Sequence, residues 1–171
     1  IDLDLYDNVR VITIDIKHFY DSIDFLGITS ILNENLNTEE KNIMQFLILY
    51  NEQLMRLCSV DESRKGVPQG PAYARIIAEI FLSCLIDKIK EEFKKQNATI
   101  DIFRYVDDII IFNNSEISDK AIYDRFSSIF AMYGLSLNVE KSRIHGKIKD
   151  LTNNGTQEIV FVIGSSCGIG K

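Results

Sequence analysis

The sequence predicts an α+β fold in which an antiparallel sheet carries helices on one face. Runs of β-branched and aromatic residues occur early, in the middle and late in the chain, and segments with helical spacing of apolar residues separate them. Two of the middle runs are only a few residues apart, as in an antiparallel hairpin. With 171 residues, of which 46% are hydrophobic, the chain is long enough for one domain with a core.

The chain begins with one predicted strand and two segments of helical pattern. Residues 9–16, VRVITIDI, are rich in β-branched residues and favour a strand. Residues 19–36 then place apolar side chains at helical spacing. Residues 37–57 predict a helix that begins with Asn37 or Thr38 as N-cap, followed by acidic residues in the first turn.

A polar loop and a long helix come next. Residues 59–71, SVDESRKGVPQGP, contain the Gly and Pro residues that are typical of loops. We expect Pro71 in the first turn of the following helix, where its missing N–H costs no hydrogen bond. Residues 72–96 gather apolar residues on one helical face, with charges toward the end.

The rest of the chain predicts a hairpin, a helix and two further strands. Residues 103–112, FRYVDDIIIF, are two short β-forming runs joined at a tight end. Residues 119–133 form an amphipathic pattern that Ser118 or Asp119 can cap and Gly134 can end. Two more strand-like runs follow, at 142–148 and 158–164.

Composition limits the classes of function. The net charge of −6 runs against nucleic-acid binding, which normally leaves a basic footprint, although catalytic carboxylates would themselves contribute negative charge. The three cysteines are far apart and show no CxxC spacing, so we expect free buried thiols. Neither a signal peptide nor an apolar run of about 18 residues is present, and a cytoplasmic protein outside the membrane is the default expectation.

Asp107 and Asp108 are adjacent at the predicted end of the hairpin. Neighbouring carboxylates repel and raise each other's pKa unless a positive charge holds them, and a hard divalent metal is the usual partner of such oxygens. A polar hairpin turn is the simpler interpretation of the pair taken alone. In an antiparallel sheet, however, the end of the first strand can lie beside this turn. Asp15 would then complete a three-carboxylate pocket for two ions about 3.5 to 4 Å apart.

Four ordered segments resemble the palm of a reverse transcriptase. VITIDIKHFYDSID resembles the first catalytic motif, GVPQGPAYARIIAE the template- and nucleotide-contacting motif, RYVDDIIIF the Tyr-x-Asp-Asp box and YGLSLNVEKSRI the Leu-Asn-x-x-Lys motif. The resemblance covers roughly residues 9 to 145 and implies the palm fold of a right-hand polymerase. The residues that follow Gln69, Gly-Pro-Ala-x-x-Arg-x-x-x-Glu, resemble the corresponding pattern of bacterial retron-related and abortive-infection reverse transcriptases.

The resemblance implies an RNA-directed DNA polymerase that adds deoxynucleotides to a primer 3′-hydroxyl. Its cofactor would be a pair of Mg²⁺ ions, for which Mn²⁺ can substitute. Its partners would be an RNA template, a nucleic-acid primer, a dNTP, and the fingers and thumb of a parent protein. Two alternatives stay open: template-independent or protein-primed DNA synthesis in antiviral defence, and a non-catalytic palm that binds RNA as a scaffold.

The same resemblance implies roles for single residues. They are, for the metal ions, Asp15, Asp107, Asp108 and the carbonyl of Ile16; for the incoming nucleotide, Tyr20, Gln69 and Gly70; for the template or primer, Arg75 and Tyr105; and for protonation of the leaving pyrophosphate, Lys141. Tyr20 would be the steric gate, whose ring crowds a ribose 2′-hydroxyl. The three aspartates and Lys141 would be the catalytic group.

Each of these side chains has a plainer interpretation. Tyr20 is an ordinary core aromatic in that view, and Gln69 a loop amide that caps the next helix. Arg75 pairs with Glu79 at i,i+4 spacing instead of binding a template phosphate. Lys141 is a surface lysine.

The remaining motifs give only weak indications of function. His18 and His145 are isolated and have no third ligand at a suitable spacing, so zinc binding is not favoured. The final GSSCGIGK departs from the spacing of a phosphate-binding loop. We expect residues 1–171 to be one palm with part of the fingers, at about 26–65. Because the chain opens without Met and ends just after a strand-like run, we expect the upstream fingers and the thumb to lie outside it.

Overall fold

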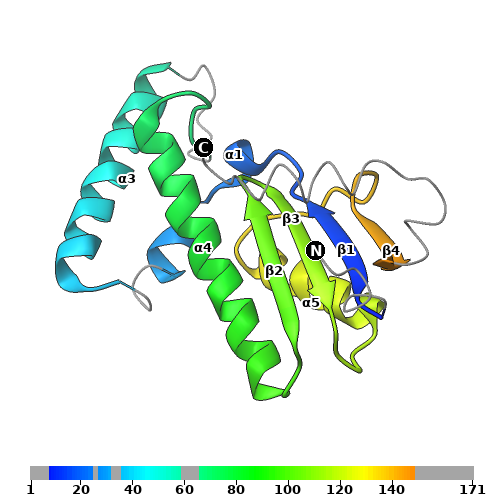
Figure 1. Cartoon of the computed structure of the whole chain (residues 1–171). Coiled ribbons are helices and arrows are strands. Elements are labelled where there is room, and N and C mark those ends of the chain that lie inside the picture. The colour runs from blue at the N-terminus through cyan, green and yellow to red at the C-terminus, as the bar shows by residue number, and fades with distance from the viewer. Residues whose placement is uncertain (1–7, 25–26, 32–35, 59–65, 149–171) are drawn as a thin grey trace, which may run out of the picture.

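A computed structural model describes residues 8–24, 27–31, 36–58 and 66–148. The elements follow the predicted order, strand, helices, hairpin, helix and strand (Figure 1). Their bounds are β1 Arg10–Asp15, α1 Phe19–Ser22, α3 Thr38–Cys58, α4 Ala72–Lys95, β2 Ile100–Tyr105, β3 Asp108–Asn113, α5 Asp119–Met132 and β4 Arg143–Lys147. The strand expected at 158–164 lies outside the described residues.

The four strands form one antiparallel sheet in the order β2-β3-β1-β4. Strands β2 and β3 are the predicted hairpin, and β1 lies between β3 and β4 although it is first in the chain. The predicted α+β fold with an antiparallel sheet is therefore confirmed.

The helices cover one face of the sheet, as expected. The larger buried cluster joins alternate residues of the central strands, such as Ile12, Ile14 and Ile111, to α4 and α5. A smaller cluster around Val11 and Ile110 lies on the other face. In Figure 1, α5 passes behind the strands, while α3 lies against α4 on the side away from the sheet. Among the described residues, the opposite face of the sheet carries no helix, and we call it the free face.

The helical pattern of residues 19–36 does not form one continuous helix, which corrects the sequence interpretation. Helix α1 ends at Ser22, Ile23 is extended, and residues 27–31 are helical again. The amides of Gly66 and Val67 donate to the carbonyls of Ile23 and Tyr20, both at 2.9 Å. These long-range bonds take carbonyls that a longer helix would use for its own ladder.

The observed starts of the helices agree closely with those predicted from the sequence. Asn37 caps α3, because its side chain accepts from the Glu40 amide at 3.0 Å while Glu40 accepts from the Asn37 amide at 2.9 Å. The Ser118 hydroxyl caps α5 by accepting from the Ala121 amide at 3.2 Å. Pro71 lies one position earlier than predicted, at the N-cap of α4, where its backbone is extended. Cys84 is a free, buried thiol, as expected, and burial raises its pKa.

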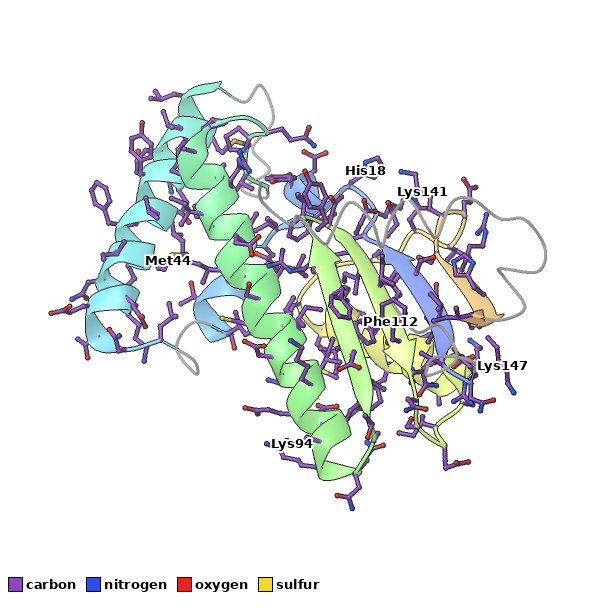
Figure 2. The ribbon with its side chains drawn as sticks, in the orientation of Figure 1. His18, Met44, Lys94, Phe112, Lys141 and Lys147 are labelled. Carbon is purple, nitrogen blue, oxygen red and sulfur yellow. The ribbon has the colours of Figure 1, made fainter. Side chains whose placement is uncertain are left out.

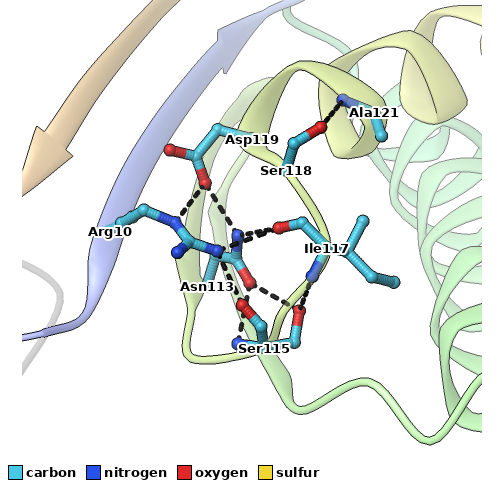
Figure 3. Close-up of polar contacts among 7 residues, drawn as sticks. All are labelled: Arg10, Asn113, Ser115, Ile117, Ser118, Asp119 and Ala121. Atoms are coloured by element: carbon cyan, nitrogen blue, oxygen red, sulfur yellow. Dashed lines mark hydrogen bonds and ion pairs between the residues drawn. The ribbon is translucent and has the colours of Figure 1, made fainter.

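A polar network ties β1 and β3 to the start of α5 (Figure 3). Arg10 donates to Asp119 Oδ1 at 2.9 Å and to the Ser115 and Ile117 carbonyls at 2.6 and 2.9 Å. The buried Asn113 amide donates to the same Asp119 oxygen at 2.7 Å. Since Arg10 and Asn113 are also partners in the strand ladder, this network fixes one end of the β1–β3 pair.

Candidate active site

The register of β1 against β3 brings two predicted site residues together at the other end of this pair. Asp15 lies directly opposite Asp108, and the ladder continues through Ile14 opposite Ile109. Directly opposed residues of an antiparallel pair project to the same face, with Cβ atoms roughly 4.5 to 5.5 Å apart. Because Ile14 and Ile109 belong to the helix-covered core, Asp15 and Asp108 project to the free face.

Asp107 lies in the turn of the hairpin. Tyr105 pairs with Asp108 across β2 and β3, which leaves Val106 and Asp107 as the two turn residues. Val106 has φ 56°, a left-handed conformation that a β-branched residue rarely adopts. Such strain persists only where surrounding contacts enforce it, and it concentrates at functional sites.

The segment after Gly134 holds the end of β1 from its other side. The Asn138 amide donates to the Asp15 carbonyl at 2.8 Å, and the Asp15 amide donates to Ser142 Oγ at 3.2 Å. Ile16 forms a bridge with Leu137 whose hydrogen bonds use neighbouring residues. The Ile16 carbonyl is therefore directed to the opposite side of the chain, where β3 and its turn lie.

Charge is concentrated among the three aspartates. The pKa of Asp108 is raised, first by desolvation and then by the negative charges of Asp107 and Asp15, while Lys141 opposes the shift. Lys141 Nζ lies 3.5 Å from Asp15 Oδ2, although 69% of the lysine side chain is exposed. An excess of negative charge that one exposed lysine offsets in part is a suitable environment for a divalent cation.

A glycine-rich loop adds the next wall of the site. The Gly66 and Val67 amides donate to the Ile23 and Tyr20 carbonyls, and the Gly66 carbonyl accepts a hydrogen bond from the buried Asn51 side-chain amide at 3.2 Å. Gly66 has φ +91°, and a Cβ there would lie 3.2 Å from the Asp21 backbone. The loop thus docks closely on α1 and delivers Gln69 next to it.

These segments enclose a cavity of about 540 Å³. Six of the predicted site residues line it: Asp15, Ile16, Tyr20, Gln69, Asp107 and Lys141. They come from β1, α1, the loop before α4, the hairpin turn and the segment before β4, so the fold collects residues up to 126 positions apart, from 15 to 141. His18 also lines this cavity, and Figure 2 shows it with Lys141 at the same end of the sheet.

The remaining predicted residues lie outside this lining. Asp108 is opposite Asp15 on the strand, Gly70 has φ +118° with open space around it, and Tyr105 is largely exposed beside the turn. Arg75 lines a second cavity of about 460 Å³ that also touches Tyr20. Tyr20 lines both cavities and also packs against the core, so its two sequence interpretations are compatible.

The alternative pairing of Arg75 with Glu79 is not what the structure has. Glu79 accepts hydrogen bonds from Arg104, at 2.8 Å for Nη1, and from Ser83. These bonds and the charge of Arg104 lower the pKa of Glu79, although desolvation opposes them. A tertiary partner on β2 replaces the local i,i+4 partner because its planar fork meets both carboxylate oxygens.

The donor set fits a magnesium site in chemistry, since carboxylates and a carbonyl are the oxygen ligands that this ion prefers. In the side-chain conformations of this structure, however, no group of three or more His, Cys, Asp or Glu among the described residues is arranged to hold a metal ion. Like charges without a cation between them turn apart, so ion binding would require the three aspartates to reorient. His145 bonds to Thr13 Oγ1 at 2.8 Å, which gives it a structural partner.

Sequence reasoning missed several residues that build this site. Asn138 and Ser142 fix the backbone of Asp15. Asn138 is part of the Leu-Asn-x-x-Lys motif, in which the sequence suggests a role only for the lysine. Asn51 is the one polar residue on the buried stripe that continues from Met44 and Ile48 in α3. A polar residue at a core position of a helix was the available signal, because such a group needs a partner.

Comparison with known proteins identifies the fold family. A family model described as "Reverse transcriptase (RNA-dependent DNA polymerase)" matches residues 5–161. The chain belongs to the reverse transcriptase family. The free-faced antiparallel sheet with its aspartates is accordingly the palm of this family. No curated protein sequence matched the chain.

A solved structure has the same fold. The telomerase of Candida albicans, determined in complex with a TWJ fragment of telomeric RNA, superposes with a TM-score of 0.53 at 17% identity. The match covers 86% of this chain and 29% of the telomerase chain, so this reverse transcriptase palm corresponds to less than a third of that protein. None of the helices in the described ranges is long and apolar enough to cross a membrane.

Proposed function

We propose that this palm is the catalytic centre of an RNA-directed DNA polymerase that adds dNTPs to the 3′-hydroxyl of a primer on an RNA template. The observation that supports this most is the convergence of Asp15, Asp107, Gln69 and Tyr20 on one cavity from separate segments. Membership of the reverse transcriptase family supports the same reaction. In this proposal α3, beyond α4, belongs to the fingers.

Asp15, Asp107 and the Ile16 carbonyl would hold two Mg²⁺ or Mn²⁺ ions, with Asp108 in support. Bound there, these ions would activate the attacking hydroxyl and neutralise the leaving pyrophosphate. The chain itself supplies position and charge. The strand register holds Asp15 beside the hairpin, and Asn138 and Ser142 fix its backbone. Phosphoryl transfer asks mainly for such positioning and electrostatics.

The other walls of the cavity would select and orient substrates. The ring of Tyr20 would exclude a ribose 2′-hydroxyl, and Gln69 with the Gly70 backbone would contact the incoming nucleotide. Lys141, whose ammonium stands beside Asp15, would donate a proton to the leaving pyrophosphate. Arg75 and Tyr105 would contact the template or primer from the exposed rim.

The test is primer extension by the full-length protein with a primed RNA template, dNTPs and Mg²⁺ or Mn²⁺. Asp107→Asn and Asp15→Asn should each lower the rate by at least ~10³-fold, because they remove charge from the reaction centre. Asp124→Asn is the matched control, since this α5 carboxylate pairs only with Lys120 on the surface among the contacts described.

Mn²⁺ binding, followed by electron paramagnetic resonance, separates the alternatives. Binding that Asp107→Asn abolishes supports the proposal. Extension of a primer without any template would replace templated copying with untemplated synthesis. Absence of both Mn²⁺ binding and extension would contradict a polymerase and favour an RNA-binding scaffold.

A further inference from the structure

Arg104, the residue of β2 just before the Tyr-x-Asp-Asp sequence, joins the hairpin turn to α4. Its Nη1 donates to the Val106 carbonyl at 3.0 Å and to Glu79 Oε2 at 2.8 Å. Its Nη2 donates to Ser83 Oγ at 3.0 Å and also bonds the second Glu79 oxygen. The arginine side chain is only 16% exposed, and both terminal nitrogens of its guanidinium are hydrogen-bonded.

The bond to Val106 is made at the strained point of the turn. Val106 has the left-handed φ, and the next residue is Asp107. A backbone held in a sparsely populated conformation needs surrounding contacts that enforce it. Within the described residues, the side-chain hydrogen bond that the Val106 carbonyl accepts comes from the Arg104 guanidinium.

The geometry requires an arginine. Its planar fork carries five N–H donors, which here reach one backbone carbonyl, one hydroxyl and both oxygens of a carboxylate. A lysine ammonium is a single point of charge and cannot span these acceptors. Exposed ion pairs contribute little to stability, and Glu79 is largely exposed, so the ion pair itself adds little to the free energy of folding.

We propose that Arg104 is a positioning residue for the polymerase centre: anchored on α4 by Glu79 and Ser83, it holds the Val106–Asp107 turn in the strained conformation that places the Asp107 carboxylate in the cavity. This inference rests on the proposed function for its consequence in catalysis. Its structural part, the restraint of the turn, is independent of that function.

The experiment compares Arg104→Lys and Glu79→Gln with a matched control. Arg125→Lys alters another ion pair made to α4, the one between Arg125 of α5 and Glu92, which does not touch the hairpin turn. For each variant of the full-length protein, hydrogen exchange of the amides at 106–108, Mn²⁺ affinity, thermal unfolding and the kinetics of dNTP addition are measured.

Arg104→Lys should speed exchange at the turn by about tenfold or more and weaken Mn²⁺ binding by about 10- to 100-fold, the range found when groups that orient metal ligands are lost. It should lower kcat by about 10- to 100-fold with little change in the KM for dNTP, since a displacement of about 1 Å can cost on the order of 100-fold. Glu79→Gln, which keeps the side-chain shape but only one of the two acceptor oxygens, should have a smaller effect in the same direction. The Tm should fall no further than in Arg125→Lys.

The outcomes separate this inference from the proposed function. If the wild-type protein extends primers but Arg104→Lys matches Arg125→Lys in turn exchange and Mn²⁺ affinity, the positioning role is wrong and the function stands. If the wild-type protein neither binds Mn²⁺ nor extends primers, the function fails, and turn exchange alone decides whether Arg104 restrains the turn. Equal losses of Tm and kcat in all three variants would also overturn the proposal.

Discussion

The charged carboxylate of Asp108 should destabilise the metal-free fold, because desolvation first, and then the charges of Asp107 and Asp15, raise its pKa. The folded chain therefore binds this proton more tightly than the unfolded chain, and stability falls as pH rises from the ordinary value of 3.8 through the folded pKa. Asp108→Asn should raise the Tm near neutral pH, and the gain should shrink as pH falls through the folded pKa.

Thermal unfolding of both proteins over a pH series, with a chelator present, measures this effect. Asp124→Asn provides the control, because removing this exposed, lysine-paired carboxylate should give no such gain near neutral pH. A Tm that drops in Asp108→Asn near neutral pH would show that the carboxylate makes a net favourable contact.

Tyr20 is the second residue whose role a single substitution can test. Its ring lines the cavity that holds Asp15 and Gln69. Tyr20→Ala should open space for a 2′-hydroxyl and raise the use of ribonucleotides relative to deoxynucleotides by at least about tenfold, measured as the ratio of kcat/KM values. Phe19→Ala, its buried neighbour, should lose stability instead, by about 3 to 5 kcal/mol. Unchanged sugar discrimination in Tyr20→Ala would leave the ring a packing role.

At the scale of elements, the loop between α3 and α4 depends on glycine for two separate reasons. Gly66 has a positive φ and also lies against the Asp21 backbone, whereas Gly70 has a positive φ in open space. Gly66→Ala should therefore cost strain plus displacement of the loop, about 3 kcal/mol or more, and Gly70→Ala strain alone, about 1 to 3 kcal/mol. Urea denaturation measures both, and an equal cost would mean that the contact with α1 contributes nothing.

Local patterns predicted most elements, because their causes are local. The cap at Asn37, the hairpin around Asp107 and the amphipathic α5 each follow from residues within one element. The break after Ser22 did not, since the donors that end α1 come from residues 66 and 67. For the same reason the i,i+4 rule offered Arg75 as a possible partner of Glu79, whereas Arg104 from another element is the partner in the structure.

The site was predictable to a similar extent. Motif order placed Asp15 near the hairpin, and the register of β1 against β3 agrees. The groups that hold the aspartates in place, Asn138, Ser142 and Arg104, contact them or their turn through backbone atoms. Side-chain chemistry in the sequence gives little sign of such bonds, because many residue types can meet a backbone carbonyl or amide.

At the scale of the whole molecule, the network around Asn113 joins three elements at the end of the sheet opposite the site (Figure 3). Asn113 is fully buried, donates to Ile117 and Asp119, and accepts from Ser115. Asn113→Ala should lower the free energy of unfolding by about 3 kcal/mol, because several buried partners lose a hydrogen bond. Asn114→Ala, an exposed neighbour, should cost less than about 0.5 kcal/mol in the same denaturation assay. Similar losses in the two variants would contradict a role for the network.

The central place of β1 also has a consequence during synthesis. Its neighbours are β3 and β4, and Thr13 contacts His145, 132 residues later. At a translation rate of roughly 5 to 20 residues per second, roughly 7 to 26 s pass between the synthesis of β1 and that of β4. Until β3 is made, the β-forming run VRVITI has unpaired edges on both sides, and until β4 is made one edge stays unpaired; such a segment can recruit chaperones or other strands. The aspartate site can therefore form only late in synthesis, and slowed translation between the two strands should lower the yield of native protein.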